Sequence, residues 1–389
     1  MRIGIDCRTI LNPDSGESAG VGHYTYFLVR HLLRNDQQNT YVLFFDNRVT
    51  DTKEFEQENV EIRRFAFSQY KKFLPFSYSH MLITAMLLKE KLDVFHAPAN
   101  IIPLTYPKTS IVTIHDLAIY KNPAWFPMQV FSTRLLVPQS LRKAQHIIAV
   151  SESTKQDLEE IFGVQPEKMS VIYEAPFTDA LHVKDRNVDI LEKFRLTQPY
   201  ILFVGTIDPR KNVEMLLEAF TIVRKHPELK SIQFILAGGK GYRHDRVLDR
   251  IAQLHLGSAI KYLGYVTHNE KLALLKNAAV FAFPSLYEGF GLPVLDAMKL
   301  GVPVVTSNVS SLPEVAGDAA IQVNPDDPKA LAGALTTVLT DPQKAADMVR
   351  KGFTQAQKFN WDQAALQTLD VYRQATKKQK KTKTKKKQK

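Results

Sequence analysis

The stretch from Ala278 to Thr306 constrains the fold of this chain more than any other. It begins with a continuous apolar run, Ala278–Phe283, which is typical of a parallel strand buried on both faces. A turn that contains Glu288 follows, and then comes a short helical segment over residues 292–300. Val302–Thr306 is a second apolar run and is predicted to be the next strand. This succession indicates a βαβ unit and therefore a parallel sheet.

The turn in this unit also has the composition of a ligand site. Gly289 and Gly291 let a ligand approach the backbone, and the following helix offers unpaired N–H groups and a positive dipole end. Pro293 suits the first helical turn, where a missing N–H costs nothing. Glu288 and Asp296 place two carboxylates at the same mouth, which suits a ligand with hydroxyls and phosphates. The alternative is a structural turn in which Asp296 only favours the start of the helix.

Apolar runs of strand length alternate with helical segments along the whole chain, which predicts α/β domains with parallel sheets. We predict a first domain over residues 1–180, a linker over 181–199, where periodicity is poor, and a second domain over 200–359. A last helix follows over 360–376. The predicted strands are 2–6, 41–45, 60–65, 93–96, 110–114, 146–150 and 169–172, followed by 200–204, 232–237, 260–263, 278–283, 302–306 and 320–323.

Residues suited to ligand binding follow directly after several of these strands. They are His115, Gly205, Arg210, Lys211, Gly238 and Glu288, with His96 as a weaker candidate. Because open parallel sheets bind ligands at the carboxyl ends of their strands, we expect two facing sheets to gather these residues in one cleft. Arg210 and Lys211 precede a helix and predict an anion site, the alternative being a solvated basic pair. His115 is either a ligand contact or a structural histidine.

A further glycine pair, Gly20-Val21-Gly22, lies between the first strand and a helix predicted from about Tyr24. Such a junction can admit a phosphate or a sugar. The third glycine of a dinucleotide fingerprint is missing and the preceding loop is long, so the pair does not predict NAD binding.

The charge of the chain is unevenly distributed. The formal net charge is +11, but residues 377–389 contain nine lysines, without which the balance falls to +2. This tail has no apolar residue and is expected to be disordered, either as a solubilising tail or as a tether to an anionic membrane or, less favourably, RNA. Lys71–Phe76 mixes basic and aromatic residues and is either a membrane contact or an ordinary loop. Met81–Leu88 is predicted to pack in the core.

Composition also indicates a cellular compartment. Cys7 is the one cysteine of the chain, so no intramolecular disulfide forms, in keeping with a reducing environment. The first 30 residues lack a signal-peptide pattern, and no apolar run reaches the ~18 residues that a membrane span requires. We therefore expect a cytoplasmic protein, in peripheral contact with the inner face of the membrane if the basic segments bind lipid.

Three motifs of the chain, and three shorter ones in support, are informative when taken together. The motifs are Glu288–Asp296, Gly205–Asn212 and Ala19–Tyr24, with His115-Asp116, Val150–Ser153 and Ser307–Val315 in support. Together they resemble the motifs of retaining glycosyltransferases of family 4, which have the GT-B fold. The resemblance covers residues 1–375, and in character it is nearest to mannosyltransferases that build O-antigen and related surface polysaccharides.

The resemblance implies an α/β GT-B fold, with two facing Rossmann-like domains, parallel sheets and a cleft between them. The first domain would bind the acceptor and the second a nucleotide-sugar donor, and the helix over 360–376 would cross back to the first domain. It also implies a retaining hexose transfer, with mannose from GDP-mannose as the leading donor and a glycan or polyprenyl-linked acceptor.

The resemblance further assigns roles to matching residues. Glu288 would hold the donor sugar, Arg210 and Lys211 the diphosphate, and His115 the sugar near its reacting carbon. Asp296, where the family usually has Glu, would hold the ribose. The remaining implied contacts are Gly20, Val21 and Gly22 with the diphosphate or acceptor, Gly238, Tyr265 and Val266 near the base, Gly205 with the donor, and Gly289, Phe290, Gly291 and Leu292 with the sugar.

No Asp-x-Asp triplet occurs in the sequence, which fits a reaction without a metal or other cofactor. The alternatives are a UDP-glucose or UDP-N-acetylhexosamine transferase, an epimerase, or a non-catalytic protein that binds sugar nucleotides and is tethered by its tail. A phosphorylase is disfavoured because it needs a longer chain, and nucleic acid is not an expected partner.

Overall fold

The computed structural model describes residues 1–11, 20–65, 76–127, 130–177 and 190–387. The chain divides into two compact units. Unit 1 comprises Met1–Lys121, Met128–Glu174 and Asn360–Lys389, and unit 2 comprises Asn122–Pro127 and Ala175–Phe359. The chain enters the long segment of unit 2 between Glu174 and Ala175, and this passage is called the crossover below. Helix α7, Ile190–Phe194, falls in the segment predicted as a linker and is part of unit 2.

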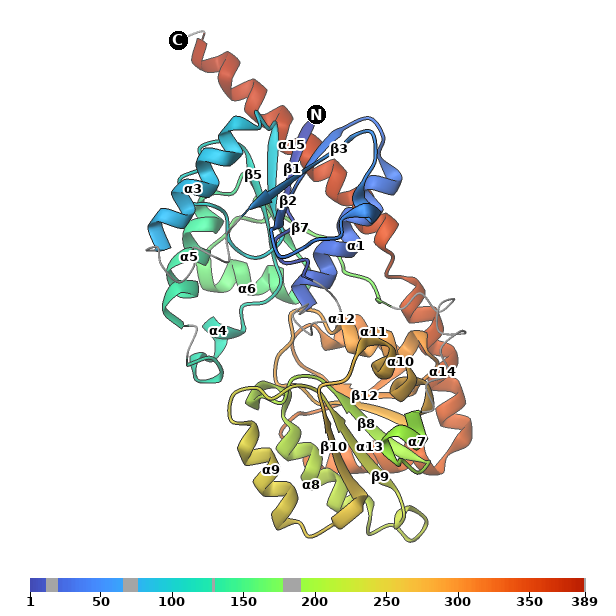
Figure 1. Cartoon of the computed structure of the whole chain (residues 1–389). Helices are drawn as coiled ribbons and strands as arrows, with labels where there is room; N and C mark the ends of the chain where they lie inside the picture. Colours follow the sequence, from blue (N-terminus) through green and yellow to red (C-terminus); the bar gives the residue numbers. More distant parts are fainter. Residues whose placement is uncertain (12–19, 66–75, 128–129, 178–189, 388–389) are drawn as a thin grey trace. The chain divides into compact units, whose positions relative to one another are not determined.

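Unit 1 is built on a parallel sheet of seven strands in the order β3-β2-β1-β4-β5-β6-β7. The strands are β1 Arg2–Asp6, β2 Thr40–Asp46, β3 Val60–Phe65, β4 Val94–Ala97, β5 Ser110–Ile114, β6 His146–Ala149 and β7 Met169–Val171. The helices are α1 Gly20–Asn35, α3 Phe76–Lys89, α4 Ala118–Lys121, α5 Val130–Lys143, α6 Glu152–Phe162 and α15 Trp361–Lys387. In Figure 1, α3, α5 and α6 cover one side of this sheet, and α1 and α15 cover the other.

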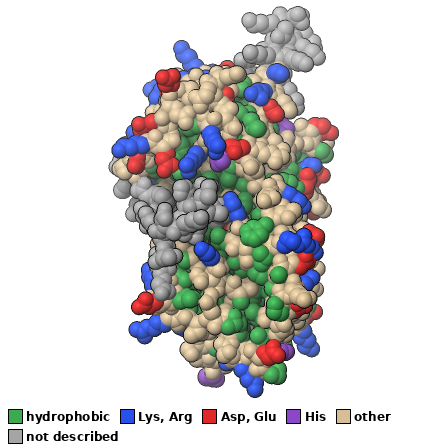
Figure 2. Space-filling model, turned by 90° about the vertical axis from the view of Figure 1, so that its right-hand side faces the viewer, with side chains coloured by type: hydrophobic (Ala, Val, Ile, Leu, Met, Phe, Trp, Pro, Cys, Tyr) green, Lys and Arg blue, Asp and Glu red, His purple; other side chains and the backbone are tan. Residues whose placement is uncertain are grey.

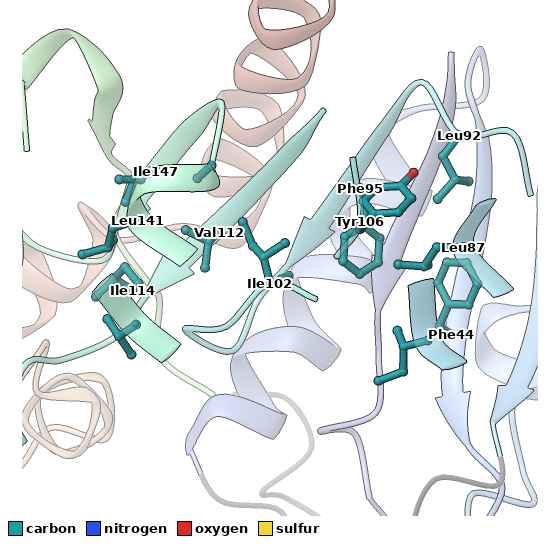
Figure 3. Close-up of a cluster of buried hydrophobic side chains, with 14 of the residues drawn as sticks. Phe44, Leu87, Leu92, Phe95, Ile102, Tyr106, Val112, Ile114, Leu141 and Ile147 are labelled. Carbon is teal, nitrogen blue, oxygen red and sulfur yellow. The ribbon is translucent and has the colours of Figure 1, made fainter. Parts of the chain in front are cut away.

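The core of unit 1 follows from the pleat of its strands, because successive side chains point to opposite faces. Phe95 and Ala97 of β4 join a cluster with Phe44 of β2 and Leu87 of α3. Figure 3 shows Phe95, Tyr106 and Leu87 together in this cluster, which continues to Ile114, Leu141 and Ile147 further along the sheet. His96, between Phe95 and Ala97 in sequence, faces the other side and bonds Tyr372 of α15.

Helix α15 belongs to unit 1 through aromatic and polar contacts. The Trp361 ring stacks on Phe27 of α1 at 5.7 Å between centroids, and Asp362 accepts a hydrogen bond from Asn35. The helix runs to Lys387, whereas the sequence predicted that it ends at 376 and that a disordered tail follows. The physical reason is local: residues 377–387 contain only Lys, Gln and Thr, without Gly or Pro, and Lys and Gln are good helix formers.

Helix α3 corrects a second expectation. Met81–Leu88 was predicted to pack in the core, but Met81 is 59% exposed, and Leu82, Met86 and Leu88 are also exposed. Ile83, Thr84 and Leu87 are buried instead, and Ile83 and Leu87 join the core cluster of the sheet. A helix that is apolar all around needs only about a third of its circumference to cover a sheet, so composition did not reveal which residues are buried. Lys71–Pro75 lie outside the described residues.

Unit 2 is built on a parallel sheet of six strands in the order β10-β9-β8-β11-β12-β13. The strands are β8 Tyr200–Val204, β9 Gln233–Ala237, β10 Ile260–Gly264, β11 Val280–Phe283, β12 Val304–Ser307 and β13 Ala320–Val323. Beyond α7, the helices are α8 Val213–Val223, α9 His244–Gln253, α10 His268–Asn277, α11 Leu292–Lys299, α12 Leu312–Ala316, α13 Pro328–Thr340 and α14 Pro342–Gln357. The predicted β11–α11–β12 unit is confirmed.

The surface agrees with the near-neutral body that the sequence indicates. On the face that Figure 2 shows, Lys and Arg side chains are interspersed with Asp and Glu side chains. Within the described part of the chain, no helix combines the length and the apolarity needed to cross a membrane.

Candidate functional site

The carboxyl edge of the unit 2 sheet carries the densest group of charged side chains among the predicted site residues. After β8, a short 3₁₀ helix spans Pro209–Lys211 and is capped by Asp208, whose carboxylate accepts from the Lys211 N–H. Asn212 then takes a left-handed conformation, φ 57°, and its amide donates to the carbonyls of Pro284 and Pro325. These bonds fix the β8 loop against the turn that follows β11 and against the segment that follows β13.

Arg210 and Lys211 meet Glu288 across these two loops. Lys211 Nζ lies 2.5 Å from Glu288 Oε1, and Arg210 Nη1 lies 3.0 Å from Glu288 Oε2. The same Arg210 nitrogen donates to the Tyr287 carbonyl at 2.9 Å. Lys211 Nζ also lies 4.8 Å from the centroid of the Phe283 ring. The three charged side chains are at most 14% exposed, so two cations and one anion form a buried triad.

The electrostatics of the triad leave one net positive charge. Burial alone would raise the pKa of Glu288, but Arg210 and Lys211 override it and lower the pKa to about 2. Burial lowers the pKa of Lys211, and the Glu288 carboxylate opposes that effect. An excess cation at the carboxyl edge of a parallel sheet favours an anionic ligand.

The turn after β11 is held by two serines of the segment before α12. The Glu288 N–H donates to Ser310 Oγ at 2.9 Å, and the Ser311 hydroxyl donates to the carbonyls of Glu288 and Phe290. Gly291 directly precedes α11 with φ 113°, and a Cβ there would lie 2.9 Å from Leu312 Cδ2. The glycine is thus required for the turn itself, and it leaves the first N–H groups of α11 at the triad's edge of the sheet.

Asp296 does not join the triad. It is 1% exposed in the second turn of α11, where Oδ2 accepts from Lys271 Nζ at 2.8 Å and Oδ1 from the Phe177 N–H at 3.1 Å. The sequence placed the two carboxylates at one mouth; in the structure Glu288 pairs with Arg210 and Lys211, and Asp296 with Lys271.

The glycines after β8 and β9 lie against each other. Gly238 has φ 149°, and a Cβ on it would fall 1.9 Å from the Gly205 carbonyl oxygen, so this close backbone approach explains the glycine at position 238. A Cβ on Gly205 would instead lie 3.3 Å from the Phe203 ring. The Gly238 N–H donates to the Gly264 carbonyl at 2.7 Å, which joins the end of β10 to the same edge. Beyond it, Tyr265 is 58% exposed and Val266 is buried.

In unit 1, His115 follows β5, its side chain is 11% exposed, and both of its ring nitrogens are engaged. Nδ1 lies 2.9 Å from Glu174 Oε1, and Nε2 lies 2.7 Å from the Pro98 carbonyl oxygen. Carboxylate and carbonyl oxygens only accept, so this geometry suits the imidazolium, in which both nitrogens donate. Burial opposes the charge, but the Glu174 carboxylate raises the pKa of His115 above its usual value.

The weaker candidate, His96, has a structural environment. Its nitrogens bond Tyr372 Oη at 2.7 Å and Thr113 Oγ1 at 2.8 Å, and it is fully buried. Burial and the charge of His115 lower the pKa of His96 to about 3. Gly20, Val21 and Gly22 form the first turn of α1, whereas the sequence predicted a loop up to Tyr24. Gly in a first turn interrupts few helical hydrogen bonds, and no space constraint explains Gly20, whose Cβ would meet nothing within 4 Å.

Sequence reasoning missed Glu174, Lys271 and Ser310. Glu174 lies 59 residues from His115 and Lys271 lies 25 residues from Asp296, in segments with no motif of their own. Ser310 lies within the supporting motif Ser307–Val315, but only its φ of 53° and its bond to Glu288 reveal its role. Among the residues that the structure describes, no three His, Cys, Asp or Glu side chains are grouped to hold a metal ion.

Comparisons with known proteins identify the family of the chain. Residues 18–175 match the family model described as Glycosyltransferase Family 4, and residues 188–355 match that of Glycosyl transferases group 1. The chain is 30% identical over 366 residues to O-antigen chain mannosyltransferase B of Escherichia coli, an alignment that covers 91% of this chain and 96% of the relative.

Two solved structures show the fold. Sucrose-phosphate synthase from Thermosynechococcus elongatus superposes with a TM-score of 0.74 at 23% identity, covering 96% of this chain and 98% of that one. HepE from Anabaena, in complex with UDP-glucose, superposes with a TM-score of 0.70 at 18% identity, covering 95% and 99%. The predicted α/β fold with two Rossmann-like units is confirmed, and the chain belongs to the GT-B glycosyltransferases of family 4.

Proposed function

We propose that this glycosyltransferase moves a hexose, mannose in the leading case, from a nucleoside-diphosphate sugar to a glycan or polyprenyl-linked acceptor with retention of anomeric configuration. The observation that carries the proposal is the buried triad of Arg210, Lys211 and Glu288. It combines an excess cation, which suits a diphosphate, with a carboxylate, which suits sugar hydroxyls. The triad lies at the carboxyl edge of a parallel sheet, which is where open α/β sheets generally bind their ligands.

The triad explains how the donor is held. Arg210 presents a planar fork that matches phosphate oxygens, and Lys211 adds a point charge. The first N–H groups of α11 supply further donors for anionic oxygens. Glu288 is kept ionised by its pKa of about 2, so it accepts hydrogen bonds from sugar hydroxyls at every physiological pH.

The same residues promote bond cleavage. In the transfer, the bond between the anomeric carbon and the phosphate oxygen breaks, and its electron pair leaves with the nucleoside diphosphate. The acceptor oxygen forms the new bond to the anomeric carbon, and its proton passes to the departing phosphate. Because negative charge grows on that phosphate in the transition state, Arg210 and Lys211 stabilise the transition state more than the bound donor. The cations thus supply the role that a metal ion has in other transferases.

The choice of sugar rests on similarity alone. The E. coli relative is named as a mannosyltransferase, which favours mannose and a GDP donor. The HepE structure was solved with UDP-glucose, so a UDP-sugar is the second candidate. No residue of the described edge distinguishes the two bases.

The test is a panel of GDP-mannose, UDP-glucose and UDP-N-acetylglucosamine, offered with and without a mannose-terminated oligosaccharide. Release of GDP from GDP-mannose, and an α-linked product by NMR from this α-linked donor, are the expected results. Turnover confined to a UDP-sugar would overturn the choice of mannose, and a β-linked product would overturn retention. No release from any donor would instead favour the non-catalytic alternative.

Membrane contact is supported by the outer face of α3. On a helical projection, Met81, Leu82, Ala85, Met86 and Leu88 fall on one continuous arc away from the sheet, and all are exposed. Lys89 and Lys91 are exposed beside them. An apolar helix face with flanking lysines suits an anionic lipid surface, which would place a lipid-linked acceptor near the enzyme.

Vesicle sedimentation tests this contact. Wild-type protein is expected to sediment with phosphatidylglycerol vesicles and less with phosphatidylcholine vesicles, and M81Q/L88Q is expected to lose most of that binding. L366Q, at an equally exposed leucine of α15, serves as the matched control, and deletion of residues 377–389 measures the share of the lysine tail. Equal sedimentation of M81Q/L88Q and wild type would contradict the role of α3.

A further inference from the structure

The segment that leaves unit 1 is held on unit 2 by Asp296. Phe177 is the third residue after the crossover, and its N–H donates to Asp296 Oδ1 at 3.1 Å. The other carboxylate oxygen accepts from Lys271 Nζ at 2.8 Å, and this Nζ lies 6.0 Å from the centroid of the Phe177 ring. One carboxylate therefore joins α11, α10 and the crossover segment.

Burial separates Asp296 from the solvent. The residue is 1% exposed, and Phe177, from whose N–H it accepts a hydrogen bond, is 7% exposed. Both of its oxygens already accept a hydrogen bond, one from a cation and one from the backbone. A ribose hydroxyl would have to displace Phe177 or Lys271 before it reached this carboxylate, and would leave a buried donor without its acceptor.

The length of the side chain agrees with this position. A Glu at this position would carry the carboxylate one methylene further. In this chain that extension would push the carboxylate into Phe177 and Lys271, because buried contacts of about 3 Å leave no room for a methylene. Asp is thus the residue whose reach matches the crossover.

We infer that Asp296 and Lys271 form an anchor that positions the crossover segment at Phe177, and that Asp296 does not bind the ribose of the donor. The anchor itself is argued from the structure alone. The statement about the ribose deepens the proposed donor site and rests on the proposed function. The other end of the same segment is held at Glu174, which pairs with His115 in unit 1. The crossover is therefore held on both sides of Ala175 and Pro176. Glu174 before them pairs with His115, and Phe177 after them bonds Asp296.

Two measurements separate an anchor from a ribose ligand. The first is hydrogen–deuterium exchange at the Phe177 amide in wild type, D296N, D296E and K271M. The second is calorimetric binding of GDP and UDP and of their 2′-deoxy and 3′-deoxy forms to the same proteins. K276M, at an exposed lysine of the same helix α10, is the matched control.

The anchor predicts that D296N, D296E and K271M each speed exchange at Phe177 by tenfold or more, and that K276M does not. It also predicts that the Phe177 amide of D296N/K271M exchanges no faster than that of the faster single variant, because both substitutions disrupt the same anchor. The ratio of ribose to deoxyribose affinity is expected to stay within twofold of wild type in all variants. A donor KM that rises equally for the ribose and the deoxyribose forms would agree with the anchor.

The inference is overturned if D296N abolishes the preference for ribose while D296E retains it and Phe177 exchanges as in wild type. Should D296N fail to fold, K271M decides alone, since a ribose-binding role for Asp296 predicts no effect of K271M on Phe177. If wild type binds neither GDP nor UDP, the proposed function fails, and exchange at Phe177 still decides the anchor.

Discussion

Lys211 Nζ and Glu288 Oε1 lie 2.5 Å apart, and both side chains are at most 10% exposed. The two residues come from loops 77 positions apart in the chain, after β8 and β11, which are neighbours in the unit 2 sheet. Parallel strands bring their carboxyl ends to the same edge, so the sheet order itself creates this pair. A donor diphosphate that binds Lys211 must share it with Glu288.

Replacement of Glu288 tests the triad directly. E288Q keeps the size of the side chain and removes its charge, so sugar hydroxyls lose an ionic acceptor while Arg210 and Lys211 remain. We expect turnover of the donor to fall by about 10²- to 10⁴-fold. E218Q, at an exposed position of α8 in the same unit, is expected to keep wild-type turnover. Near-normal turnover of E288Q would remove Glu288 from the site.

The lowered pKa of Glu288 also predicts a pH dependence of stability. Its folded pKa is about 2 against 4.5 for the free group, so its contribution is present above pH 4.5 and is lost as the pH falls toward 2. This shift corresponds to about 3 kcal/mol of unfolding free energy near pH 7. Urea unfolding of wild type and E288Q at pH 7 and pH 3 should show that their difference shrinks by more than half. A difference independent of pH would contradict the ion pair.

Much of the fold and part of the site are predictable from such patterns. All thirteen predicted strands are present. The inner strands of each sheet are the clearest in the sequence, because a strand buried on both faces is a continuous apolar run bounded by polar turns. Glu288, Arg210 and Lys211 were predicted to gather because each follows a strand of the same sheet. Such patterns do not predict contacts between residues that are far apart in the sequence. Phe177 lies 119 residues from Asp296, and nothing in its neighbourhood in the sequence indicates that its N–H bonds that carboxylate. The exposed face of α3 was missed for a related reason, since an apolar residue has the same hydropathy whether or not a neighbour covers it.

Gly238 provides a test of the backbone contact that shapes this edge. A Cβ at Gly238 would lie 1.9 Å from the Gly205 carbonyl oxygen, and φ is 149°, so G238A must distort both loops. We expect a loss of unfolding free energy of about 3 kcal/mol. G239A is the matched control, because nothing lies within 4 Å of a Cβ there. Equal chemical denaturation midpoints for the two variants would contradict the close approach of the loops.

Lys211 is expected to bind phosphate rather than base or ribose. K211M preserves the length of the apolar stem and removes the charge, so the affinity for GDP or UDP should fall about 10- to 100-fold. The affinity for guanosine or uridine should change less than twofold. Calorimetric titration of each pair of ligands measures both, with K225M, an exposed lysine, as the control. An equal loss for nucleoside and diphosphate would show that the effect of K211M is a general one on the loop.

His115 and Glu174 predict a pH dependence of the opposite sign in unit 1. The Glu174 carboxylate raises the pKa of His115 above its usual value of about 6.5, so the pair stabilises the folded state below that pH and loses this contribution as the pH rises through the folded pKa. In E174Q an amide oxygen still accepts from Nδ1, but the carboxylate charge is gone and the preference for the imidazolium weakens. Wild type should therefore unfold at a higher temperature than E174Q at pH 6, and this difference should narrow by pH 9. E167Q, at an exposed glutamate of the same unit, should follow wild type at both values. A difference in unfolding temperature that grows with pH would mean that His115 is neutral in the folded protein. Its single ring N–H would then donate to Glu174 or to the Pro98 carbonyl, but not to both.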